Sequence, residues 1–83
     1  LIESILRDCP YVKGYHGFEF FTTGENYILE LHIFFEGSLN ISLVHGYLTN
    51  IEQKIRNNVK IENLQNIILH SEPLSGRTDG IIF

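Results

Sequence analysis

One strand–turn–strand segment constrains the fold more than any other part of the chain. Residues 15–22 are rich in aromatic side chains, and residues 27–36 alternate in the pattern of a strand. Gly24 lies between them and suits the positive φ of a hairpin turn. A hairpin centred on Gly24 would pair His16 with His32, and opposed residues have Cβ atoms about 5 Å apart. A slip of one residue would remove this pairing.

The alternation gives the hairpin two faces of different character. We expect the strongly apolar face to pack on helices; it holds Tyr15, Phe21, Tyr27, Leu29, Leu31, Ile33 and Phe35. The other face is too aromatic for a solvated surface and too polar for a core; it holds His16, Phe18, Phe20, Ile28, Glu30, His32, Phe34 and Glu36. Exposed apolar patches mark interfaces, so this face predicts contact with a second copy. The alternative is that the C-terminal tail covers its aromatic side chains.

One helix is expected before the hairpin in the sequence, and another after it. Residues 1–9 place apolar side chains on one helical face, and Pro10 ends that helix. The strongest helical periodicity in the chain joins Ile41, Val44, Leu48, Ile51 and Ile55. Ser38 or Asn40 can cap this second helix at its N-terminus.

A third strand is predicted at residues 67–71, and Pro73 stops it because proline cannot donate to a sheet. The order helix, strand, strand, helix, strand predicts an α+β two-layer sandwich of the ferredoxin-like or metallochaperone-like type. We expect a three-stranded mixed sheet with both helices on one face. The domain is expected to cover residues 1–73, followed by a loose C-terminal tail with an apolar end over residues 74–83.

Length and charge limit what the chain can do. Its 83 residues allow one domain with a small core. A net charge of −4 argues against nucleic acid and anionic membranes as partners, since both bind clustered Lys and Arg. No apolar run approaches the roughly 20 residues of a membrane span, so we expect no membrane insertion by this segment. The chain begins at Leu1 within a helical pattern, which suggests a piece of a longer protein.

The candidate chemistry rests on four histidines and one glutamate. His70 and Glu72 lie two apart on a strand and face the same side, which provides half of a divalent metal site. His16, His32 and His45 fall on three other elements. Each histidine also has a plain structural reading, as a helix-surface residue, a cross-strand pair or a strand end. No Ser/His/Asp order, phosphate-binding glycine loop or CxxC is present, so we do not expect an enzyme.

The ordered motifs resemble the cytoplasmic C-terminal domain of cation diffusion facilitator transporters, the zinc-efflux family, over about residues 1–73. The family pattern Pro-x-Val-x-Gly-x-His is matched by residues 10–16, and its hairpin glycine by Gly24. The strand motif apolar-His-apolar is matched by residues 31–33, and the helix histidine by His45. The final His-x-Asp/Glu-Pro is matched by residues 70–73.

The resemblance implies a cytosolic regulatory domain of a membrane divalent-cation efflux transporter, on the cytoplasmic side of the cell membrane and joined to the transporter's transmembrane domain. It implies a homodimer that is stabilised or tightened by two ions of zinc, or of another divalent transition metal, near its interface. The implied ligands are His16, His32, His45, His70 and Glu72. Two features depart from the family: a longer segment between the last two histidines, and a glutamate where some members have aspartate. A metal-free dimerisation or small-ligand regulatory module of similar topology is the alternative.

Overall fold

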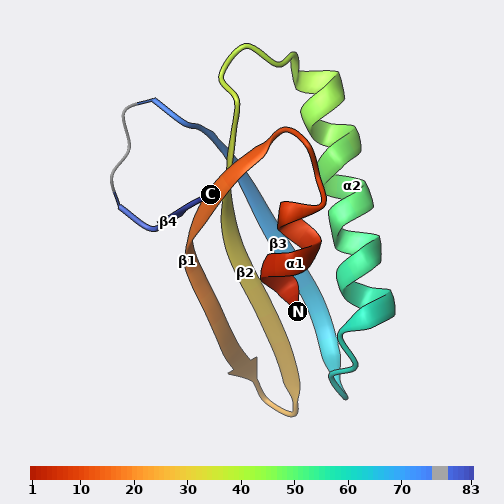
Figure 1. Ribbon diagram of the computed structural model, residues 1–83. Coiled ribbons are helices and arrows are strands. Elements are labelled where there is room, and N and C mark those ends of the chain that lie inside the picture. The colour runs from red at the N-terminus through yellow and green to blue at the C-terminus, as the bar shows by residue number, and fades with distance from the viewer. Residues whose placement is uncertain (76–78) are drawn as a thin grey trace.

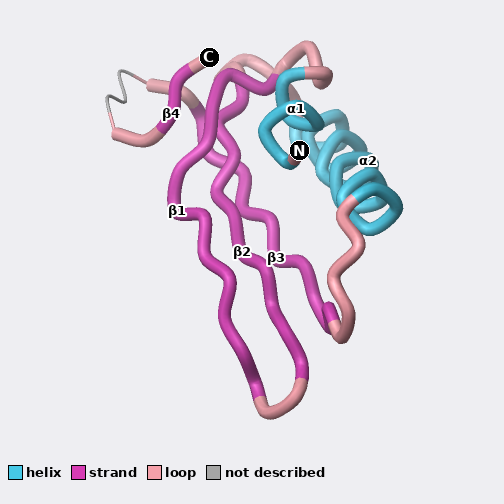
Figure 2. The backbone as a smooth tube through the Cα atoms, turned by 60° about the horizontal axis from the view of Figure 1, so that its bottom comes forward, coloured by secondary structure: helices cyan, strands magenta, loops and turns pink. Residues whose placement is uncertain are grey.

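The computed structural model describes residues 1–75 and 79–83 as two helices packed on one side of a mixed sheet (Figures 1 and 2). The elements in order are α1 (Ile2–Arg7), β1 (Val12–Thr23), β2 (Asn26–Phe35), α2 (Ile41–Asn58), β3 (Leu64–Pro73) and β4 (Ile81–Ile82). The strand order is β3-β2-β1-β4, and only the β2–β3 pair is parallel. The predicted α+β fold is therefore confirmed. Among the described residues, no helix has the length and apolar character needed to span a membrane.

The core lies between the helices and the central strand β2. Every second residue of β2 from Leu29 to Phe35 faces the helices and is at most 2% exposed, as the apolar alternation predicts. Ile5 and Leu6 of α1 and several residues of α2 and β3 complete this cluster. The side chain of Asn40 accepts a hydrogen bond of 2.8 Å from the backbone N–H of Leu43, which caps the N-terminus of α2. The sheet thus has one face filled by helices, and its other face is left for the site.

The expectation of a three-stranded sheet is wrong by one short strand. Ile81 and Ile82 of the tail pair antiparallel with Tyr15 and Gly14 of β1, so the sheet has four strands. A two-residue strand is too short to show an alternation in the sequence. In Figure 1, β4 lies beside β1, at the edge of the sheet opposite β3. The part of the predicted tail at residues 76–78 lies outside the described residues.

The β1–β2 hairpin changes register twice, between Val12 and Gly14 and, nearer the turn, at a β-bulge between His16 and Glu19. Around a two-residue loop at Gly24 and Glu25, the pairs run from Thr23↔Asn26 to Glu19↔Glu30, one residue away from the predicted register. The register then shifts between His16 and Glu19, and His16 lies opposite His32 as predicted. Gly17, with φ +61°, provides the left-handed residue at this bulge. The bulge thus restores the predicted histidine pair.

The bulge also reassigns the aromatic side chains of β1, so the predicted composition of the interface face is wrong in part. Phe20 pairs with the core residue Leu29 and stacks on Tyr27, which places it on the helix side. Phe18 lines a pocket formed with α1 on the same side. Phe34 lies on the opposite face and is fully buried. Phe21, which was predicted to face the helices, lies instead beside Ile28 on the site face.

Candidate metal centre

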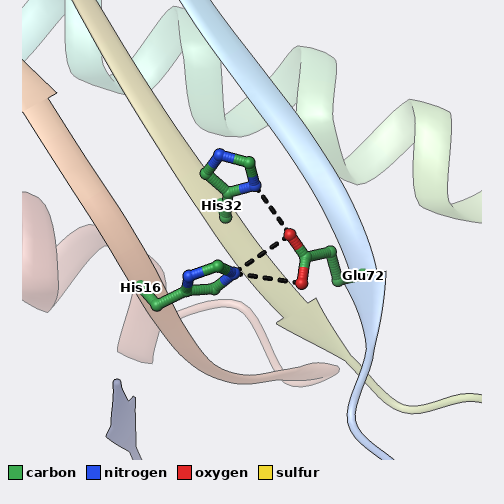
Figure 3. Close-up of side chains that lie close together, drawn as sticks. All are labelled: His16, His32 and Glu72. Atoms are coloured by element: carbon green, nitrogen blue, oxygen red, sulfur yellow. Dashed lines mark hydrogen bonds and ion pairs between the residues drawn. The ribbon is translucent and has the colours of Figure 1, made fainter. Parts of the chain in front are cut away.

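Three strands bring an imidazole, a second imidazole and a carboxylate together on the face opposite the helices (Figure 3). His16 lies on β1, His32 on β2 and Glu72 on β3. Nε2 of His16 is 3.0 Å from both carboxylate oxygens of Glu72, and Nδ1 of His32 is 2.6 Å from Oε2 of the same residue. One carboxylate therefore joins both histidines, and the ligand atoms of all three residues lie within 4.8 Å of one another.

A second group shares His32 and extends toward the hairpin turn. It consists of Glu30, His32 and His70, again with ligand atoms within 4.8 Å of one another. Oε1 of Glu30 is 3.9 Å from Nε2 of His32, and Oε2 of Glu30 is 3.6 Å from Nε2 of His70. His32 pairs with His70 in the parallel register, and their rings stack at 4.5 Å and 18°. Both ring nitrogens of His32 thus face a carboxylate.

The site is half-buried, and its histidines are held by ring packing. The side chains of His16, His32 and Glu72 are 23–27% exposed, whereas His70 is 47% exposed at the rim. The ring of His16 stacks on the buried Phe34 at 5.0 Å and 15°. Partial removal from water strengthens the attraction between imidazole, carboxylate and any bound cation. The packing also limits how far the rings can turn.

The tail contributes a further acidic group to this face. Oδ2 of Asp79 lies 4.0 Å from Nδ1 of His16, the nitrogen that does not contact Glu72. Asp79 is 58% exposed and precedes β4, so the pairing of β4 with β1 places it beside the site. Among the described residues, carboxylates and imidazoles therefore alternate across the sheet, from Asp79 at one edge to His70 at the other.

The donor set fits a divalent transition metal. Zinc in proteins takes imidazole nitrogen and carboxylate oxygen at about 2.0–2.2 Å, and three protein ligands leave a position for water or another ligand. Each of the two groups offers two imidazole nitrogens and one carboxylate. The same set also suits cobalt, nickel or manganese.

The structure brings together four of the five residues that the sequence singled out. His16, His32, His70 and Glu72 lie on one face of the sheet within the two groups. His45 belongs to neither group; it lies exposed in the first turns of α2 and lines, together with Glu72, a pocket at the ends of β2 and β3.

Sequence reasoning missed Glu30 and Asp79 as members of this cluster. Glu30 lies two residues before His32 on the same strand face, and that spacing was the available signal. Asp79 had no such signal, because its position depends on a tail that carries no recognisable pattern. Both residues add negative charge beside the histidines.

Comparisons with known proteins agree with the fold. A family model described as the cytoplasmic domain of cation efflux proteins matches residues 1–74. A metal-bound C-terminal domain of the CzcD transporter from Thermotoga maritima superposes with a TM-score of 0.75 and 22% identity, covering 89% of this chain and 84% of that one. The cytosolic domain of a cation diffusion facilitator family protein superposes with a TM-score of 0.75 and 22% identity, covering 92% of this chain and 87% of that one.

A zinc form of a MamM CTD variant gives a TM-score of 0.74 and 16% identity, with 99% of this chain and 89% of that one covered. No curated protein was found to match the chain in sequence.

Proposed function

Because the chain belongs to the cation efflux family and matches its cytoplasmic domain over residues 1–74, we propose that it binds divalent metal ions and reports their concentration to a membrane transporter. The observation that carries this proposal is the convergence of His16, His32 and Glu72 from three strands. Zinc is the probe of choice, since the donor set suits it and a similar solved domain is a zinc form.

The proposed ligands are those of the sequence prediction. Within one chain, His16, His32, His70 and Glu72 supply nitrogen and oxygen donors on a single face. His45 is exposed and belongs to neither group, so it is available for a contact with the same face of a second copy. In a two-fold homodimer, His45 of the partner subunit then completes the shell that one chain leaves open.

The proposed mechanism is a shift between two dimer arrangements. A metal ion changes such an equilibrium only by its different affinity for the two states. Only in the closer dimer arrangement can the ligands on β1, β2 and β3 and the one from the partner all bind the metal ions together. Each copy carries a net charge of −4, so divalent ions also relieve repulsion between the subunits. Metal binding therefore tightens the dimer, and the joined transmembrane domain receives the change.

The test compares inter-subunit distances with and without zinc, by small-angle scattering or by paired spin labels. The wild type and a His32→Ala/His70→Ala variant are measured, because neither histidine contributes to the apolar core. Zinc is expected to shorten the distance in the wild type alone. A zinc-induced rise in melting temperature should accompany it, equivalent to about 2.7 kcal/mol at a concentration of 100 Kd.

Two outcomes would contradict parts of this proposal. Equal distances in all four samples, with zinc bound to the wild type, would leave metal binding but remove regulation through the dimer. Absence of zinc binding by the wild type would favour a metal-free dimerisation module of the same topology.

A further inference from the structure

We propose that Glu30 is a metal ligand, and that it forms with Nε2 of His32 and Nε2 of His70 a second cation position on the same sheet face. This inference rests on the proposed function and adds to it a residue outside the predicted ligand set. The position would take a divalent transition metal bound by two imidazoles and one carboxylate.

The first argument is the orientation of His32. A neutral imidazole carries one N–H donor and one acceptor nitrogen. Nδ1 of His32 lies 2.6 Å from a Glu72 oxygen, a short distance that fits an N–H donating to a carboxylate. Nε2 then presents its lone pair toward Glu30 and His70. Metal-binding histidines commonly hold their other ring nitrogen to a carboxylate in this way. In this position, Glu72 orients the ligand and Glu30 is the ligand carboxylate; the His16 group then offers an ion Nε2 of His16 and the Glu72 carboxylate, and not Nδ1 of His32.

The second argument is distance. Two ligands about 2.1 Å from one tetrahedral ion lie roughly 3.4 Å apart. The oxygens of Glu30 are 3.9 Å from Nε2 of His32 and 3.6 Å from Nε2 of His70. These separations are too long for hydrogen bonds and close to the spacing of atoms around an ion. Each oxygen of the Glu30 carboxylate faces one of the two imidazoles: Oε1 faces His32, and Oε2 faces His70. An ion between the three groups would shorten each oxygen–nitrogen distance by a few tenths of an ångström, to roughly 3.4 Å.

The third argument is charge. Glu30 lies directly opposite Glu19 across the β1–β2 pair, and opposed like charges destabilise a sheet. Within the described part of the chain, the only ion-pair partners of Glu30 are the two histidines, and no Lys or Arg side chain lies within 4.0 Å. Glu30 is also only 27% exposed, so water screens it incompletely. A bound divalent cation offsets this repulsion and gives the carboxylate its missing positive partner.

The test is zinc titration by calorimetry, with zinc content checked after gel filtration. Glu30→Gln keeps the side-chain shape but removes the charge and one donor oxygen. Glu19→Gln is the matched control, because it removes the same charge from the opposite residue on the same face. We expect Glu30→Gln to lose one zinc-binding event and Glu19→Gln to retain it. His70→Ala should lose the same event, and the double variant Glu30→Gln/His70→Ala should lose no more than either alone.

A separate variant distinguishes this position from the His16 group. His16→Ala should retain the binding event that Glu30→Gln removes. The inference is overturned if Glu30→Gln binds zinc as the wild type does, or if Glu19→Gln weakens binding equally, since the effect is then general electrostatics. If the wild type binds no zinc, the proposed function itself fails; if it binds zinc and Glu30→Gln changes nothing, only this inference fails. Circular dichroism of each variant shows that a loss does not come from unfolding.

Discussion

The carboxylate of Glu72 on β3 contacts His32 on the neighbouring parallel strand β2, although the two residues are not paired in the strand register. In the register of β2 and β3, His32 pairs with His70, and Glu72 pairs with Phe34. The carboxylate nevertheless lies 2.6 Å from Nδ1 of His32, because a glutamate side chain is long enough to reach a diagonal neighbour. The same carboxylate contacts His16 on β1, so it joins β3 to both other long strands.

Replacing Glu72 by Gln should weaken zinc affinity by about 10–100-fold, which is the usual cost of losing a group that orients a metal ligand. The amide keeps the length of the side chain but lacks the charge. Glu62→Gln is the control, since Glu62 is exposed in the connector before β3 and belongs to neither group. Isothermal titration calorimetry measures both affinities. Equal affinities for the two variants would contradict a role for Glu72.

A second prediction concerns two glycines with nearly the same backbone conformation. Gly17 and Gly24 have φ +61° and +65°, so alanine at either position should cost about 1–2 kcal/mol of unfolding free energy. A Cβ at Gly17 would lie 2.8 Å from Cδ2 of His32, whereas a Cβ at Gly24 would have no described heavy atom within 4 Å beyond its immediate chain neighbours. Urea unfolding should therefore show a loss of stability for both variants, larger for Gly17→Ala because of this clash, and zinc titration should show weaker binding for Gly17→Ala alone. Unchanged zinc affinity of Gly17→Ala would contradict the packing of His32 against the bulge.

Much of the fold follows from local patterns in the sequence. The apolar alternation from Leu29 to Phe35 predicts the core face of β2, and three–four spacing predicts α2. The pairing of His16 with His32 was also predicted, although the residues nearer the turn are displaced by one. That prediction holds because two departures cancel: a two-residue loop shifts the register and the bulge shifts it back.

The features that could not be predicted depend on backbone irregularity or on distant segments. Alternation alone assigns Phe18 and Phe20 to the site face, and the bulge moves them to the helix side. An isolated glycine within a strand is a recognised bulge signal, so Gly17 was the clue. Glu30 resembles an ordinary solvated strand residue until β3 brings His70 beside it. Such neighbours are set by the parallel register, which no local pattern specifies.

The tail should add measurable stability to the domain. The rings of Phe83 and Tyr15 have centroids 6.0 Å apart, and Cζ of Arg7 lies 4.3 Å from the centroid of the Phe83 ring. The backbone N–H of Phe83 donates a hydrogen bond to the backbone carbonyl of Lys13. Phe83→Ala should lower the unfolding free energy by about 1 kcal/mol, since it removes both apolar area and a cation–π contact. Phe83→Leu, which keeps most of the apolar area, should lose less. Urea midpoints measure the difference, and a wild-type midpoint for Phe83→Ala would show that the tail adds no stability.

A further prediction follows from the hydrogen bond that Tyr15 donates to Glu3 at 2.9 Å. This bond, helped by Arg7, lowers the pKa of Glu3 below its ordinary value of 4.5, and the same bond raises the pKa of Tyr15 above 10.0. The lowered pKa of Glu3 stabilises the fold above pH 4.5, and this contribution is lost as the pH falls through the folded-state pKa. The raised pKa of Tyr15 stabilises the fold below pH 10, and this contribution is lost as the pH rises through its folded-state pKa.

Tyr15→Phe should therefore reduce stability at neutral pH and make the decline toward both acid and alkaline pH shallower. Urea midpoints measured from pH 3 to 10.5 give the two profiles. Tyr27→Phe provides a control, since it removes a phenol from the same sheet without touching the Glu3 bond. Parallel pH profiles for the wild type and Tyr15→Phe would contradict this account.

The parallel pairing of β2 with β3 has a consequence for the order in which the chain folds. The β1–β2 hairpin is local and can form early, whereas the β2–β3 pair is non-local because α2 lies between the two strands in sequence. His16 and Glu72 are 56 residues apart in sequence, so their contact closes a much longer loop than the hairpin does. A cation that needs both groups finds no binding site on the hairpin alone. We therefore expect such an ion to stabilise the chain only once β3 has joined the hairpin.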